Sequence, residues 1–232
     1  MKILVIAATE AEIALSIKHI ASIATEVKPL VFEHNGHVII FSFIGVGIVA
    51  TTYNLAKMLA DETYDLVIQA GIAGAFDRNI ALGDMFLVRS DRLADMGAED
   101  GNSFVDIFDL NLTNADEPPF TNKLLINPYS AAELGIQLKE ADAITTNTVT
   151  GSHDSVKRLQ KQYPTALESM EGAAFHYVCL CEGVMFAQVR TVSNYIERRN
   201  RGSWQIEPAL KTLNGFLIDL LIEKTNVPAK KP

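Results

Sequence analysis

The chain of 232 residues is short of positive charge, of cysteine and of long apolar segments. Its 20 lysines and arginines face 28 aspartates and glutamates, whereas a protein that binds nucleic acid needs a broad positive surface. Two cysteines, Cys179 and Cys181, can form neither a disulfide framework nor a four-ligand zinc site. No segment reaches the roughly 18 apolar residues of a membrane span, and the first apolar run is too short for a signal peptide. We therefore expect a cytoplasmic protein with neither nucleic-acid nor membrane partners.

Several catalytic motifs are also missing, among them the G-x-S-x-G elbow, H-E-x-x-H and the P-loop. The five histidines have no ligand spacing, so we expect no metal and no organic cofactor. Residues 45–50, GVGIVA, imitate a dinucleotide-binding turn, but the next strand ends in VIQAGIAG without the carboxylate that would hold ribose hydroxyls. A dinucleotide-dependent oxidoreductase is therefore the weakest alternative.

Short apolar runs alternate with helical patterns, which is typical of an α/β layer fold. Thr9 and Glu12 have capping-box spacing at the start of a helix, and Asn35-Gly36 lies between two alternating runs, as in a tight hairpin. Residues 91–119 form a long polar excursion. We expect one domain over residues 1–224 and a frayed tail over 225–232. Strands are expected at 2–8, 64–74, 82–90, 141–151 and 184–194, and helices at 9–21, 45–61, 152–163, 170–183 and 207–224.

Small residues follow the central strand, where Ala73 and Gly74 expose the backbone at the end of a predicted parallel strand. Such strand ends line the ligand crevice of open α/β sheets. The alternative is a plain glycine turn without a ligand, which has the same sequence pattern. In ESMEGAAF, Glu171 enters an apolar helix beside Met170. A buried carboxylate needs partners, which sugar hydroxyls could supply; stabilisation by the helix dipole is the alternative.

Four segments occur together in this chain: ATEAEI, GVGIVATTYNLA, QAGIAGAF with LGD, and ESMEGAAF with VRTVSN. In this order they resemble the nucleoside phosphorylase and nucleosidase superfamily, and only residues 91–142 match poorly. The resemblance implies a single α/β domain in which helices flank a twisted, mixed central β-sheet. It also implies a homo-oligomer, a dimer or larger.

The N-terminal segment separates the branches of that superfamily. The phosphorylases carry a phosphate site there that is rich in glycine and contains arginine, whereas residues 8–19 of this chain contain neither residue and offer Glu10 and Glu12. Carboxylates repel phosphate but can orient and deprotonate water. The segment is similar to that of the nucleosidases, in which a glutamate at the position of Glu12 activates water. Water is therefore the expected nucleophile.

The strand end RTVSN indicates the leaving base. Adenosine-type nucleosidases carry aspartate where this chain has Asn194, and an amide NH2 can donate to N7 and O6 of a 6-oxopurine. Asn194 thus favours a hypoxanthine-type base. The resemblance further implies that Glu171 and Met170 bind the ribose and that Ala73 and Gly74 face it through their backbone. Arg190 is expected to order the carboxylates.

Residues 190–204 contain four arginines and the single tryptophan. From Ser193 to Trp204 they are similar to the futalosine hydrolases of the alternative menaquinone route, whose substrate is an inosine derivative with a benzoate at its 5′ end. Trp204 or Phe104 would contact the aryl ring, and Arg198, Arg199 or Arg201 would bind the carboxylate. A solvated basic loop is the plain alternative.

The resemblance therefore implies that the chain hydrolyses futalosine to hypoxanthine and dehypoxanthine futalosine. Another nucleosidase or a phosphorylase for inosine-, methylthioadenosine- or adenosylhomocysteine-type nucleosides is the first alternative. A catalytically silent nucleoside-binding protein of the same fold is the second, and the presence of both Glu12 and Glu171 argues against it.

Overall fold

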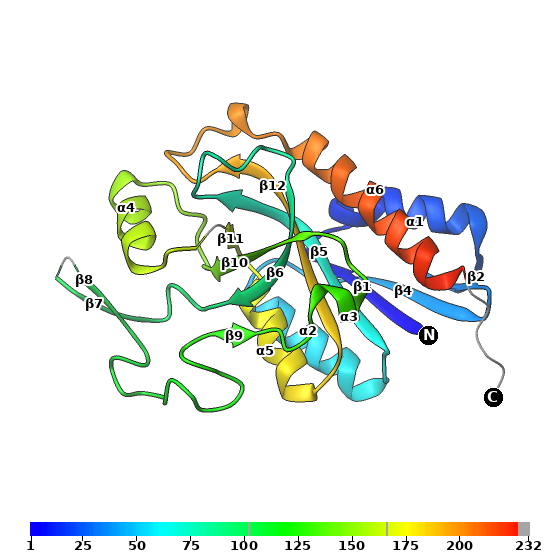
Figure 1. Cartoon of the computed structure of the whole chain (residues 1–232), viewed down its shortest axis with the longest axis horizontal. Helices are drawn as coiled ribbons and strands as arrows, with labels where there is room; N and C mark the ends of the chain where they lie inside the picture. Colours follow the sequence, from blue (N-terminus) through cyan, green and yellow to red (C-terminus); the bar gives the residue numbers. More distant parts are fainter. Residues whose placement is uncertain (102, 166, 227–232) are drawn as a thin grey trace.

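The computed structural model describes residues 1–101, 103–165 and 167–226. A ten-stranded mixed sheet runs through these residues in the order β11-β10-β6-β12-β5-β1-β4-β3-β2, with β9 beside β6 (Figure 1). The strands are β1 (Lys2–Ala7), β2 (Thr25–Lys28), β3 (Val31–His34), β4 (His37–Phe43), β5 (Leu66–Ala75), β6 (Met85–Asp91), β7 (Gly97–Asp100), β8 (Ser103–Asp106), β9 (Leu125–Ile126), β10 (Lys139–Thr145), β11 (Leu167–Ser169) and β12 (Phe186–Tyr195).

Helices cover both faces of the sheet (Figure 1). They are α1 (Glu10–Ile23), α2 (Ile48–Asp61), α3 (Ala131–Leu134), α4 (His153–Gln162), α5 (Gly172–Glu182) and α6 (Ile206–Thr225), with a short 3₁₀ turn, η1 (Arg201–Ser203). This arrangement is the α/β fold with a twisted, mixed central sheet that the sequence predicts.

Alternate residues of β1 enter two different cores, because successive side chains of a strand point to opposite faces. Ile3 and Val5 pack with α1 and α6, whereas Leu4 and Ile6 pack with α2 and α5. Both faces are therefore apolar, as the continuous run KILVIA requires. The two cores fix β1 and β5 at the centre of the sheet, and the segments that leave these strands are held in place.

The sheet curls back on itself at its β11 edge. Strand β11 pairs in parallel with β10 and antiparallel with β5, so β5, β12, β6, β10 and β11 close a ring. The pairing sets Glu168 opposite Gly74. Through this closure the residues after β11 lie against the ends of β5 and β12, which are distant from them in sequence.

The predicted excursion over residues 91–119 contains a separate antiparallel pair, β7 with β8, that projects from the body (Figure 1). Near the C-terminus, α6 continues to Thr225 and covers the first residue of the predicted frayed tail. Asn226 caps that helix, and residues 227–232 of the predicted tail lie outside the described residues. Across the described ranges, no helix is long and apolar enough to cross a membrane.

Candidate active site

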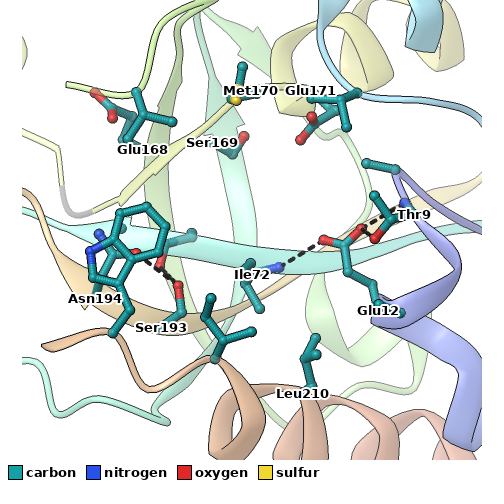
Figure 2. Close-up of a pocket in the computed structure, with 18 residues that line it drawn as sticks. Thr9, Glu12, Ile72, Glu168, Ser169, Met170, Glu171, Ser193, Asn194 and Leu210 are labelled. Carbon is teal, nitrogen blue, oxygen red and sulfur yellow. Dashed lines mark hydrogen bonds between the residues drawn. The ribbon is translucent and has the colours of Figure 1, made fainter. Parts of the chain in front are cut away.

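A cavity of about 280 Å³ opens where parallel strands β1, β5 and β12 end. Ligands of open α/β sheets bind at such carboxyl ends, because the loops there diverge and leave a crevice. Each of the three strands brings polar or small residues to its wall, and α6 closes the opposite side (Figure 2). The lining residues are Ala8, Thr9, Ala11, Glu12, Val46, Ile72, Ala73, Gly74, Val149, Glu168, Ser169, Met170, Glu171, Ser193, Asn194, Trp204, Ile206 and Leu210.

Glu12 is held in the first turn of α1 by the predicted capping box. Its Oε2 accepts from the Thr9 backbone N–H at 2.9 Å and from the Thr9 hydroxyl at 3.1 Å. Its Oε1 accepts from the Ile72 N–H at 3.4 Å across the cavity floor (Figure 2). Burial raises the pKa of this carboxyl, and the positive charge of Arg190 partly opposes that rise. A carboxyl with a raised pKa is a better proton acceptor than an exposed one.

Arg190 lies in β12 with only 2% of its surface exposed and is not among the described residues that line the cavity. Its Nη2 donates to Gln69 Oε1 at 2.7 Å and lies 3.9 Å from Glu171 Oε2. A Cβ at Gly71 would stand 2.1 Å from Arg190 Nη1 and 2.9 Å from Glu12 Oε1. The guanidinium therefore fits beside both carboxylates only because residue 71 has no side chain.

Glu171 is the N-cap of α5 and is buried. Its Oε1 accepts from the Gly47 N–H at 3.0 Å. Gly47 has a φ of 88°, a left-handed conformation that favours glycine. The glycine turn of residues 45–50 thus binds the protein's own carboxylate through Gly47. Met170 lies next to Glu171 on the same wall (Figure 2).

Asn194 stands at the end of β12, where the register with β5 shifts between Val192 and Asn194. Its Oδ1 accepts from the Ser193 hydroxyl at 2.8 Å, and its Nδ2 donates to the Tyr195 carbonyl at 3.1 Å. Because a carbonyl can only accept, these bonds identify which amide atom is nitrogen. A Cβ at Gly74 would stand 3.2 Å from this nitrogen. One N–H of the amide remains for a ligand.

The described cavity wall includes Trp204 but not the other residues predicted for the 5′ end. Arg198, Arg199 and Arg201 are exposed on the segment that leads to Trp204. Phe104 belongs to β8, where the Arg158 guanidinium lies 5.2 Å from its ring centroid. A contact of these four residues with substrate stays a prediction.

Sequence reasoning assigned no role to Glu168, Val149 or Ser193, which also line the cavity. Glu168 accepts from the Thr150 N–H at 2.9 Å and from the Thr150 hydroxyl, so it fastens the turn after β10 to the wall. The available signal was a second glutamate in ESMEG, two residues before Met170. The side to which that glutamate points depends on the pairing of β11 with β5. Among the described residues, no group of three His, Cys, Asp or Glu side chains could hold a metal ion.

The chain is an α/β protein with a twisted mixed sheet, and its cavity has Glu12 and Glu171 at one end and Glu168 and Asn194 at the other (Figure 2). The chain belongs to the phosphorylase superfamily, whose family model matches residues 2–217. It is similar to futalosine hydrolase from Thermus thermophilus, with 31% identity over 78% of this chain and 80% of the relative. Futalosine hydrolase from Acidothermus cellulolyticus is 35% identical over 73% of this chain and 69% of its own length.

The solved structures agree with this assignment at the level of the fold. The methylthioadenosine/adenosylhomocysteine nucleosidase of Colwellia psychrerythraea, solved with adenine, superposes with a TM-score of 0.77 at 20% identity. The match covers 95% of this chain and 94% of that one. Together these relatives make the chain an N-glycosidase that hydrolyses nucleosides with water.

Proposed function

We propose that the chain hydrolyses the N-glycosidic bond of futalosine, releasing hypoxanthine and dehypoxanthine futalosine. The observation that carries this proposal is the orientation of Asn194, whose Oδ1 accepts from Ser193 while its Nδ2 remains a donor at the cavity. N7 and O6 of a 6-oxopurine are both acceptors, so a donor suits them. The similarity to the futalosine hydrolases of Thermus thermophilus and Acidothermus cellulolyticus supports the same substrate.

Glu12 is the proposed base. A water molecule between its carboxylate and C1′ of the sugar would lose a proton to Glu12 as its oxygen bonds to C1′. The C1′–N9 bond breaks, and its electron pair stays on the purine. Asn194 donates to that purine, stabilising the growing negative charge without transferring its own proton. Solvent then protonates the released hypoxanthine anion and Glu12 returns its proton to solvent, which restores the carboxylate and balances the reaction.

Glu171 is the proposed ribose ligand. The Gly47 N–H and the nearby Arg190 guanidinium leave its carboxylate acceptor positions for two sugar hydroxyls. Its charge would also stabilise the positive, oxocarbenium-like sugar that forms as the base departs. Met170 packs beside the ring, and Ala73 and Gly74 allow the sugar to approach the backbone of β5.

The apolar part of the cavity wall suits the 5′ substituent. Trp204, Ile206 and Leu210 line the cavity at and just before the start of α6, and Val46 lines it from the glycine turn. An aryl ring placed there is removed from water at a gain of about 25 cal/mol per Å². The arginine that binds the carboxylate of the 5′ substituent would come from residues 198–201, outside this wall.

The test offers the purified protein futalosine, inosine and methylthioadenosine separately, with and without phosphate, and measures free base by chromatography. Hydrolysis of futalosine at the same rate without phosphate is the expected result. The second candidate, a nucleosidase for methylthioadenosine, takes its support from the fold shared with the Colwellia psychrerythraea enzyme. Base release from methylthioadenosine alone would favour that candidate, and a requirement for phosphate would favour a phosphorylase.

Self-association belongs to the same proposal. Val49 and Tyr53 lie one turn apart on α2 and are 81% and 66% exposed, beside Val46 on the cavity wall. A second copy that covers this apolar strip would shield the cavity mouth from water. Light scattering should give a mass of at least two chains, and Tyr53→Glu should lower it; a monomeric wild-type protein would refute the assembly.

A further inference from the structure

Glu168 and Asn194 stand on the two sides of one residue. In β11 Glu168 pairs with Gly74 of β5, and in β12 Asn194 pairs with the same Gly74 from the opposite side. Neighbouring strands are about 4.8 Å apart, so the two backbones are separated by about 10 Å. Gly74 puts no side chain into that gap. Both polar side chains line the cavity, on the side away from Glu12 (Figure 2).

Glu168 is 5% exposed, and among the described residues no cation forms an ion pair with its carboxylate. Within the described part of the chain, Glu168 accepts two hydrogen bonds, one from the Thr150 N–H and one from the Thr150 hydroxyl. A carboxylate offers about four acceptor positions, so about two remain. Burial raises the pKa of this carboxyl. Leaving a buried acceptor unpaired is costly, and a ligand donor would relieve that cost.

A 6-oxopurine supplies such a donor. Its N7 and O6 accept hydrogen bonds while its N1–H donates, so its edge needs a donor on one side and an acceptor on the other. An aminopurine reverses this requirement, because its N1 accepts and its exocyclic nitrogen donates. A carboxylate beside N1 therefore favours the first base and repels the second.

We propose that Glu168 accepts a hydrogen bond from N1–H of the purine and, with Asn194, selects a 6-oxopurine base. This inference rests on the proposed function and extends it by assigning the far edge of the base. Glu168 is thereby a specificity-determining residue that contacts the substrate, and Thr150 holds its carboxylate in place.

Base binding can be measured without turnover, because the single tryptophan, Trp204, lines the cavity and reports binding through its fluorescence. The probes are hypoxanthine and 1-methylhypoxanthine, in which a methyl group replaces the N1 proton, at pH 7.5. The wild-type protein should bind hypoxanthine at least about 10-fold more tightly, the usual effect of a hydrogen bond to a charged group. Glu168→Ala should weaken the binding of hypoxanthine by about 10- to 100-fold. The binding of 1-methylhypoxanthine should stay the same or become tighter, so that the discrimination between the two bases disappears.

Thr150→Val is the matched control, since it removes one hydroxyl bond to Glu168 and keeps the carboxylate. If Glu168 only holds the turn after β10 in place, Thr150→Val and Glu168→Ala will each weaken the binding of both bases by the same factor. The proposal predicts instead that Thr150→Val keeps the preference for hypoxanthine. Equal binding of the two bases by the wild-type protein would overturn the role of Glu168 and leave the proposed function standing. Binding of adenine but not hypoxanthine would overturn both.

Discussion

Raising the pH from 4.5 to 7.5 is expected to destabilise the fold by about 2 kcal/mol through one carboxyl, that of Asp91. Asp91 lies at the end of β6 under the start of α5 and is fully buried. Its oxygens accept from Gln188 Nε2 at 3.1 Å and from the Thr145 hydroxyl at 2.9 Å. The Thr145 hydroxyl oxygen in turn accepts from the Ala173 N–H, so this network holds the helix start that follows Glu171.

Burial raises the pKa of Asp91 from its usual 3.8 to about 6, although its hydrogen bonds oppose that rise. The folded state therefore keeps a proton that the unfolded chain loses, and stability falls as the pH rises from about 4 to about 6. Two pKa units correspond to about 3 kcal/mol, of which about 2 kcal/mol fall between pH 4.5 and 7.5.

The assay compares urea unfolding of the wild-type protein and Asp91→Asn at both pH values. The amide cannot titrate, so the free energy of unfolding of the wild type minus that of the variant should fall by about 2 kcal/mol between pH 4.5 and 7.5. His176, whose pKa burial lowers to about 4, titrates in both proteins and largely cancels. A difference that stays constant within about 0.5 kcal/mol would refute the protonation of Asp91.

Three other variants test the site. Gly71→Ala should lower kcat/KM by at least about 100-fold, because its Cβ would stand 2.1 Å from Arg190 Nη1, whereas the control Gly215→Ala, with open space around it, should keep full activity; circular dichroism of both checks the fold. Glu12→Gln should lower kcat by about 100- to 10,000-fold, and near wild-type turnover would move water activation elsewhere. Trp204→Ala should raise KM for futalosine more than for inosine; an equal rise would contradict the aryl wall.

Local features of the fold could be predicted because their causes are local. Asn35 and Gly36 have φ values of 50° and 79°, and they join β3 to β4 as the hairpin motif predicts. Gly183 ends α5 with a φ of 64°, which the glycine after the apolar helix indicates. The strand β11 has only three residues, and its pairing with β5 is long-range, so no periodicity could reveal it.

The candidate site also has a part that the sequence could predict and a part that it could not. Glu12, Glu171 and Asn194 lie in motifs next to strand or helix ends, and the structure brings all three to one cavity, while their roles stay predictions. The arginines of residues 198–201 lie outside the described cavity wall, and their contact with substrate stays a prediction. Charge density indicates an anion partner but not the direction of the side chains. Here Glu197 forms an exposed ion pair with Arg78, and the arginines that follow it are exposed and do not line the described wall.

The central claim, that this N-glycosidase recognises a 6-oxopurine through Asn194, is tested most directly by Asn194→Asp. The measurement is the ratio of kcat/KM for futalosine to kcat/KM for methylthioadenosine in phosphate-free buffer at pH 7.5, for wild type and variant. A carboxylate cannot donate to N7 and O6, so the ratio should exceed 1 in the wild type and fall by at least about 10-fold in the variant. A wild-type ratio below 1, or a ratio unchanged by the substitution, would contradict the account.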